Sequence, residues 1–298
     1  MDKTLKGVRI LSLALNLPGP AALMRCQAMG AHCTKLEPPA ASVADKKSAP
    51  KASSDPMSLY NRKAYDTMHT GVRLLTADLK TEKGQQALHR ALAKSDVLLT
   101  SFRPSALVKL GLTWKALHKQ YPTLSMVQIV GAPGERAEEP GHDLTYLAEN
   151  DLVTGLDLPP TLYADMGGSL MTSEAVLKAR LHTLTSGKGV LLEVALSEAA
   201  AYLALPRTWG LTRDGAAVGG AHAGYRVYAC KDGRVAVAAL EPHFARSLAT
   251  LAGLEQATMA AMFTPQAQTT IAQFMAGKTR KQLDALAIRH DIPLHTLR

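Results

Sequence analysis

Short runs of consecutive apolar residues alternate with amphipathic segments through the first two thirds of the chain. Six runs have the length and composition of strands, and they span residues 8–13, 33–36, 74–79, 97–102, 125–130 and 190–196. Most are apolar at successive positions and do not alternate with polar residues. This pattern is typical of strands that are covered on both faces of a sheet.

Helix signals lie between these strands. Pro20 opens an apolar segment that Gly30 ends, and Thr81 precedes a segment with apolar residues at helical spacing, so it is a candidate N-cap. Strands and helices in alternation predict an α/β fold with a doubly wound, Rossmann-like parallel sheet. We assign this large domain to residues 1–205.

The pattern changes after residue 205. A linker at 206–224 is rich in glycine and alanine, and two short strands flank Asp232-Gly233, a typical hairpin turn. Helical patterns then cover 244–252, 265–276 and 280–288. Residues 225–298 therefore form a predicted smaller α+β domain. In the large domain, residues 38–57 lack periodicity and are rich in Ala, Ser, Pro and Lys, which predicts a mobile surface loop.

Composition narrows the class of partner. The net charge is +9, but the basic residues are scattered and aromatic residues make up only 5%, so nucleic acid is not an expected partner. A basic surface and a polyphosphorylated small ligand both stay open as explanations. No apolar run is long enough to span a bilayer, and the three cysteines form no CxxC pair, which favours a reduced, cytoplasmic protein without a membrane partner. The histidines show no clustered spacing, so no metal site is expected.

Two segments combine residues suited to proton transfer or nucleophilic attack. The first runs from Pro140 to Tyr146 and contains His142; the second places Asp165 before Gly167 and Gly168, at an expected helix start. Backbone N–H groups of such glycines can stabilise an enolate or oxyanion. A satisfied turn and a helix cap are the structural alternatives for these segments.

The chain as a whole resembles the class III CoA-transferase superfamily (CaiB/BaiF type), and most closely its alpha-methylacyl-CoA racemases. The blocks that carry the resemblance occur in the family's order, and they are 7–11, 17–20, 29–39, 77–80, 95–104, 110–112, 141–146, 164–168 and 225–244. The resemblance implies an enzyme acting on acyl-CoA thioesters, with coenzyme A as part of the substrate and no permanently bound cofactor. It also implies an interlocked homodimer.

The resemblance assigns roles to single residues. In the racemases a histidine and an aspartate exchange a proton at the α-carbon of a 2-methylacyl-CoA, and these positions match His142 and Asp165, with Glu241 supporting His142. In the transferases the aspartate instead forms an acyl anhydride. His142 favours the racemase, because the transferases usually carry an aromatic residue there. CoA transfer through Asp165 and acyl-CoA binding without catalysis are the alternatives.

The resemblance also implies a set of CoA-binding residues. Arg103, in the Phe-Arg-Pro block, is the best match for a phosphate-binding residue, and Lys35 is a weaker one. Asp143 and Tyr146 are expected to line the CoA arm.

Overall fold

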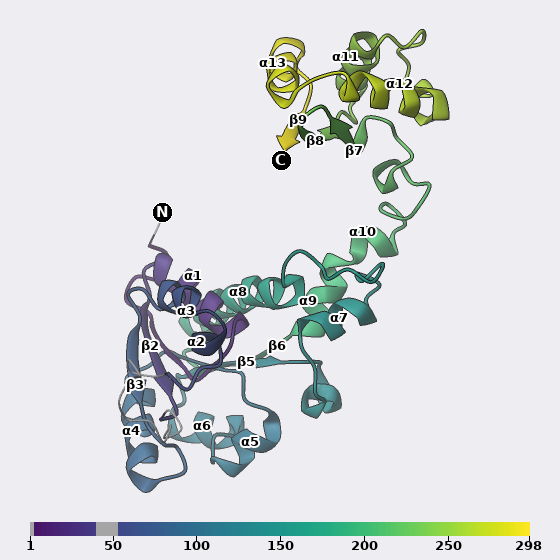
Figure 1. Ribbon diagram of the computed structural model, residues 1–298. Coiled ribbons are helices and arrows are strands. Elements are labelled where there is room, and N and C mark those ends of the chain that lie inside the picture. Colours follow the sequence, from purple (N-terminus) through teal and green to yellow (C-terminus); the bar gives the residue numbers. More distant parts are fainter. Residues whose placement is uncertain (1–2, 40–52) are drawn as a thin grey trace. The chain divides into compact units, whose positions relative to one another are not determined.

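The computed structural model describes residues 3–39 and 53–298, and the chain divides into two compact units, Met1–Ala204 and Leu205–Arg298 (Figure 1). The helices of the first unit are α1 (Pro18–Ala28), α2 (Met57–Tyr60), α3 (Arg62–Met68), α4 (Glu82–Leu92), α5 (Pro104–Lys109), α6 (Trp114–Gln120), α7 (Asp143–Glu149), α8 (Tyr163–Ser186) and α9 (Leu196–Leu203), with a 3₁₀ turn at Gly134–Glu138. None of the helices in the described residues is both long and apolar enough to cross a bilayer.

A six-stranded parallel sheet forms the centre of the first unit. Its strands, in spatial order, are β3 (Arg73–Thr76), β2 (His32–Glu37), β1 (Arg9–Ser12), β4 (Val97–Thr100), β5 (Ser125–Val130) and β6 (Leu191–Ala195). The strand order reverses direction between β1 and β4. In doubly wound folds ligands bind at this switch point, outside the carboxyl ends of the strands.

Each face of the sheet has its own apolar core. One core joins α1 and α8 to side chains such as Ile10, Leu99 and Val127. The other joins α4, α5 and α6 to the alternate strand positions, among them Leu11 and Leu98. The strands are therefore buried on both sides, and this explains their continuous apolar sequence.

The second unit is an antiparallel sheet with helices packed on one face. Its strands are β7 (Tyr225–Cys230), β8 (Gly233–Ala238) and β9 (Leu294–Leu297), and its helices are α10 (Leu205–Thr208), α11 (Pro242–Ala252), α12 (Pro265–Ala276) and α13 (Arg280–His290), with 3₁₀ turns at Ala217–Gly219 and Ala261–Phe263. Side chains of β7 and β8 form one apolar core with those of the helices.

The predicted fold class is confirmed, and two details differ from the sequence-based expectation. Thr81 caps α4 as predicted, because its Oγ1 accepts a hydrogen bond from the N–H of Gly84 at 3.1 Å. Strand β9 was not predicted. The expected surface loop at 38–57 is also wrong at its end: residues 40–52 lie outside the described residues, but Asp55 is fully buried and α2 begins at Met57.

Candidate active site

A cavity of about 310 Å³ lies at the switch point of the parallel sheet. Leu15 and Asn16 enter it from the end of β1, Ser101 and Arg103 from the end of β4, and further groups from the loop after β5. His142 and Asp165 both line it, as do Tyr146 and Glu139. The structure therefore brings four of the predicted site residues together: His142, Asp165, Arg103 and Tyr146.

The two candidate catalytic side chains stand at the starts of two helices. His142 is exposed and immediately precedes α7, where its backbone N–H donates to Thr145 Oγ1 at 3.1 Å. Asp165 lies in the first turn of α8 and is partly buried.

Asp143 connects the two helix starts. Its side chain is buried, and its Oδ1 accepts a hydrogen bond from the backbone N–H of Asp165 at 2.9 Å. We expected Asp143 to line the CoA arm, but it is not among the residues that line the cavity. Its carboxylate instead caps the start of α8 and so fixes the backbone of Asp165.

The pKa of Asp165 is raised to about 6. Burial is the main cause, and the negative charge of Asp143 adds to it. Desolvation and a like charge both disfavour the ionised carboxylate. Asp165 therefore titrates close to neutrality, where one group can both accept and return a proton.

Two glycines leave room for the Tyr146 side chain, which lines the cavity. A Cβ atom at Gly131 or at Gly141 would overlap the Tyr146 hydroxyl, so neither position tolerates a side chain. Burial is the main cause that raises the pKa of Tyr146, and the neighbouring Asp165 charge adds to it. The phenol therefore stays neutral and can act as a hydrogen-bond donor in the cavity.

Gly167 and Gly168 have a different place from the one expected. Helix α8 begins at Tyr163, so both glycines lie beyond the first four N–H groups that a helix leaves free. A Cβ at Gly167 would press on Leu203 of α9, at 3.1 Å from its Cδ1, and a Cβ at Gly168 would overlap Leu196. These glycines let α8 and α9 pack closely, and they are not the expected oxyanion donors at a helix start.

Lys35 is likewise not available to a phosphate. Its side chain is fully buried, and Nζ forms salt bridges to Glu37, at 2.9 Å from Oε1, and to Asp55. It also lies 3.0 Å from Nε2 of His69. Nδ1 of His69 lies 2.6 Å from the Tyr65 carbonyl, which can only accept, so Nε2 accepts from Lys35.

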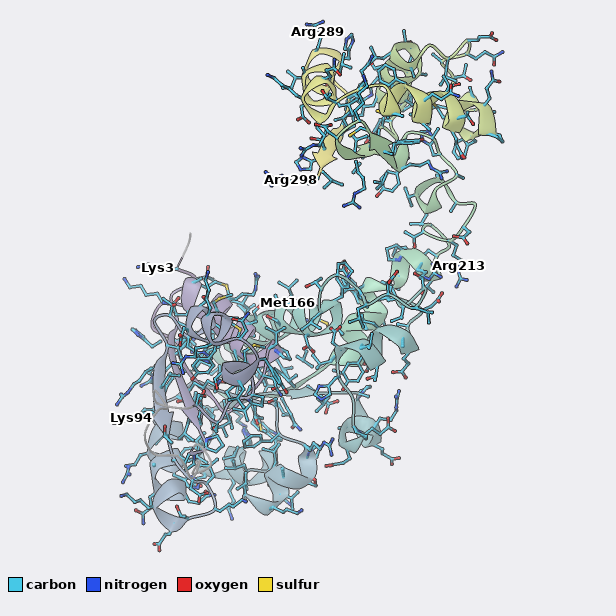
Figure 2. The ribbon with its side chains drawn as sticks, viewed as in Figure 1. Lys3, Lys94, Met166, Arg213, Arg289 and Arg298 are labelled. Atoms are coloured by element: carbon cyan, nitrogen blue, oxygen red, sulfur yellow. The ribbon has the colours of Figure 1, made fainter. Side chains whose placement is uncertain are left out.

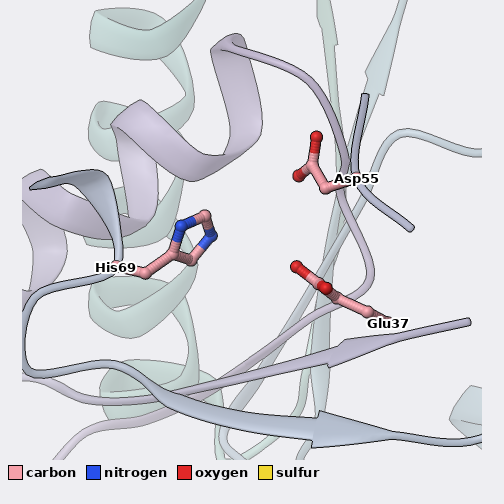
Figure 3. A group of neighbouring side chains, drawn as sticks. All are labelled: Glu37, Asp55 and His69. Carbon is pink, nitrogen blue, oxygen red and sulfur yellow. The ribbon is translucent and has the colours of Figure 1, made fainter. Parts of the chain in front are cut away.

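The same cluster contains three side chains that could in principle bind a metal ion. Glu37, Asp55 and His69 present their ligand atoms within 4.8 Å of one another, and Figure 3 shows the three side chains. The Lys35 ammonium, however, is already hydrogen-bonded to all three. They therefore satisfy an ammonium in place of a metal ion, and the cluster is a buried ion network.

The network also supports the cavity. Oδ1 of Asp55 accepts from the backbone N–H of Asn16 at 3.0 Å, and Asn16, with a left-handed φ of 64°, lines the cavity after β1. Sequence reasoning missed Asn16 and Ser101. The signal was present, because Asn16 follows the predicted strand 8–13 and Ser101 lies at the end of the predicted strand 97–102, at the carboxyl end of the sheet, where ligands bind.

The remaining predicted residues are exposed. Arg103 precedes α5, directly after β4, and is the one arginine or lysine among the described residues that line the cavity. Glu241 belongs to the second unit, where it precedes α11.

A family model described as "CoA-transferase family III" matches residues 5–298. The chain belongs to CoA-transferase family III. This confirms the resemblance that the sequence blocks carried.

The relatives of this family III chain differ in activity. Cinnamoyl-CoA:phenyllactate CoA-transferase of Clostridium sporogenes is 31% identical over 207 residues, which is 66% of this chain and 50% of the relative. A probable fatty acyl-CoA transferase of Mycobacterium tuberculosis is 30% identical over 207 residues, 66% of this chain and 52% of the relative. The human alpha-methylacyl-CoA racemase is 27% identical over 300 residues, covering 93% of this chain and 73% of the relative. The chain thus spans about half the length of the two transferases.

Solved structures show the same fold. The Mycobacterium tuberculosis protein Rv3272 matches with a TM-score of 0.80 at 23% identity, over 100% of this chain and 86% of that chain. A CaiB/BaiF family protein from Brucella suis gives a TM-score of 0.78 at 21% identity, over 100% of this chain and 85% of that one.

Proposed function

We propose that this family III chain catalyses 1,1-proton transfer at the α-carbon of a 2-methylacyl-CoA, with His142 and Asp165 as the acid–base pair. The proposal rests on the observation that both side chains line one cavity at the switch point. The pKa of Asp165, raised to about 6, adds to it. The racemase that matches 93% of the chain supports it.

The proposed reaction exchanges one proton for another on opposite faces of the substrate. The Asp165 carboxylate takes the α-proton, and the C–H electron pair moves into the thioester enolate. The His142 imidazolium then gives its proton to the other face of the α-carbon and becomes neutral. For the opposite enantiomer the two roles are reversed, so a carboxyl group with a pKa near 6 suits both directions.

Other residues bind the substrate in this proposal. Arg103 offers its guanidinium to the phosphates of CoA, for which bidentate hydrogen bonds are well suited. Tyr146 orients the thioester end, since its hydroxyl stays neutral. Coenzyme A enters and leaves as part of the substrate, and the reaction needs no resident cofactor.

CoA transfer is the second candidate, because two relatives at 30% identity or more are named as transferases. In that reaction the Asp165 carboxylate attacks the thioester carbonyl carbon, CoA leaves as the thiolate, and a mixed anhydride between Asp165 and the acyl group remains. An exposed histidine at the cavity is not required for this step. Binding of acyl-CoA without chemistry is the third candidate.

Deuterium uptake distinguishes these functions. The protein is incubated with a 2-methylacyl-CoA in heavy water, and uptake at the α-carbon is followed by mass spectrometry. Proton transfer predicts uptake by the wild type and its loss in His142→Ala and in Asp165→Ala. Retained uptake in both variants would contradict the assignment. Absence of uptake in the wild type, together with a hydroxamate formed when hydroxylamine attacks the anhydride on Asp165, would favour CoA transfer. Calorimetric binding without either signal would favour the third candidate.

We also propose that the enzyme is a homodimer of a reducing, cytoplasmic compartment. Helix α8 carries exposed apolar residues in two groups, Met166 and Leu170 near its start, just after the exposed Leu162, and Leu181 and Leu184 near its end. Such exposed apolar groups on a helix of 24 residues favour a protein partner. Cys26, Cys33 and Cys230 are all free thiols, as expected under reducing conditions.

A further inference from the structure

The first unit contains a second large concave site, which we call the basic groove. Its volume is about 1080 Å³. It lies over the amino ends of β1, β2 and β3, and residues of α4 and of the end of α1 line it. Its basic residues are Lys3, Arg9, His32, Arg73, Arg90 and Lys94, and Figure 2 labels the first and last of them.

Strand register gathers these charges. Arg9 of β1 is paired with His32 of β2, and Thr34 of β2 is paired with Arg73 of β3. All four side chains lie on one face of the sheet, because residues two apart in a strand point the same way. Arg90 lies in the last turn of α4, Lys94 follows two residues after that helix ends, and both line the groove.

The positive charge of the groove is almost uncompensated. None of its lining residues is acidic. Arg9 is paired with Asp96, at 3.3 Å, whereas the structure over residues 3–39 and 53–298 gives no carboxylate partner to Arg73, Arg90, Lys94 or Lys3. Unpaired cations that share one concavity repel one another, and a bound polyanion relieves that repulsion.

The groove also has an apolar section. Leu75 of β3 and Ala91 of α4 are only partly buried against the core beneath, and Ala87 lies one turn before Ala91. These side chains offer an apolar surface in the same groove as Arg73 and Arg90. A planar ring could lie on it while its phosphates meet the cations.

The basic groove is separate from the candidate active site. Arg9 begins β1, whereas Leu15 and Asn16 follow its other end and line the active-site cavity. The two cavities share no lining residue. A strand of four residues is roughly 13 Å long, so the two sites lie at opposite edges of the sheet.

We propose that the basic groove binds a nucleoside di- or triphosphate, with the phosphates on Arg73, Arg90 and Lys94 and the base against Leu75, Ala87 and Ala91. The groove, at about 1080 Å³, is slightly larger than the roughly 300–1,000 Å³ common for small-molecule pockets, so it has room for such a ligand. The proposal is independent of the reaction at the other site.

Calorimetry on the full chain tests the proposal with ADP, pyrophosphate and adenosine as probes. We expect saturable ADP binding that weakens with added salt, weaker binding of pyrophosphate, and no detectable binding of adenosine. Arg90→Ala with Lys94→Ala should weaken ADP binding by at least about tenfold, as should Arg73→Ala. The matched control is Lys115→Ala with Lys119→Ala, an exposed pair at the same spacing on α6, which should leave binding unchanged.

Three results would overturn the proposal. The first is absence of saturable ADP binding, and the second is equal binding by the groove variant and its control. The third is pyrophosphate binding as tightly as ADP, which would leave no role for the base. Arg103→Ala separates the two sites: ADP affinity that falls in this variant and not in the groove variants would place the nucleotide at the active site.

Discussion

The carboxylate of Asp143 binds the backbone N–H of Asp165 at 2.9 Å, and its charge also raises the pKa of the Asp165 side chain. One residue thus holds the candidate catalytic group in place and adjusts its protonation. The two effects are separable, because an amide oxygen can accept the same hydrogen bond without carrying charge.

Asp143→Asn should keep the position of Asp165 and lower its pKa. The rate of α-proton exchange, measured against pH, should then rise at a lower pH than in the wild type. The pKa should stay above its ordinary value, since burial is the larger cause of the shift. An unchanged pH profile would contradict the electrostatic role of Asp143.

Asp143→Ala is the companion variant. It removes the acceptor as well as the charge, so the start of α8 loses its cap, at a cost of about 1 kcal/mol in the free energy of unfolding. We expect the exchange rate to fall about tenfold or more below that of Asp143→Asn, because a misplaced catalytic group is inefficient. Equal rates in the two variants would show that the hydrogen bond is not needed to position Asp165.

Ionisation of Asp165 as the pH rises should lower the stability of the fold and raise the exchange activity. Its pKa is higher in the folded chain than in the unfolded one, so its contribution to the free energy of unfolding is complete below pH 4 and is lost as the pH rises to about 6. The amide in Asp165→Asn does not ionise, so the variant does not lose this stability as the pH rises. We expect the variant to be more stable than the wild type at pH 8, by about 1–3 kcal/mol, and to differ less at pH 4.

Urea unfolding at the two pH values measures this difference, and the wild-type exchange rate should rise through pH 6 as the carboxylate ionises. A stabilisation of Asp165→Asn that is the same at both pH values would contradict the raised pKa. The exchange activity of the variant should be lost at every pH, because the amide is not a base.

Lys35 should matter for folding and not for CoA binding. Burial alone would raise the pKa of Glu37, but hydrogen bonds from Ser53, Lys35 and Tyr65, together with the Lys35 charge, lower it. Lys35→Met leaves the carboxylates of Glu37 and Asp55 buried without their cation. Breaking a buried pair in this way costs about 3–5 kcal/mol, and thermal unfolding should show a correspondingly lower midpoint.

Arg103→Ala provides the contrast for Lys35→Met. Its side chain is exposed, so the free energy of unfolding should change little, whereas CoA affinity by calorimetry should fall about tenfold. If folded Lys35→Met loses CoA affinity as Arg103→Ala does, with no loss of stability, Lys35 is a CoA ligand after all.

Added zinc should not stabilise the wild type, because Lys35 occupies the centre of the Glu37, Asp55 and His69 group.

The sequence predicted the sheet and most of the site because their signals are local. A strand buried on both faces has a continuous apolar run, as at Ser125–Val130, and a side chain that follows such a strand lies at the carboxyl edge. His142, in the loop after the fifth predicted strand, and Arg103, which the family resemblance selected, both line the cavity. Strand β9 escaped prediction because Leu294 to Leu297 has no glycine turn or apolar run of its own, and only pairing with β8 makes it a strand.

Lys35 and the two glycines show the limit of such reasoning. Burial of Lys35 depends on Asp55 and His69, which lie 20 and 34 residues further along the chain, and a pattern of single residues does not reveal that contact. In the sequence, a Gly-Gly pair at a helix start cannot be told from one inside a helix, and this applies to Gly167 and Gly168. Their meaning comes from Leu203 and Leu196 on α9, which only the folded packing brings close.

The exposed apolar residues on α8 yield the last prediction, which concerns the proposed homodimer. Leu181 and Leu184 are 64% and 63% exposed, so a charged side chain fits there in the single chain but not in a buried interface. We expect the wild type to have the mass of a dimer by light scattering at micromolar concentration, and Leu181→Glu with Leu184→Glu to shift it to a monomer. Ile288→Glu, at a position that is 87% exposed on α13, is the control and should leave the mass unchanged. A wild-type monomer would refute the dimer, and a double variant that stays dimeric would show that the interface lies elsewhere than on α8.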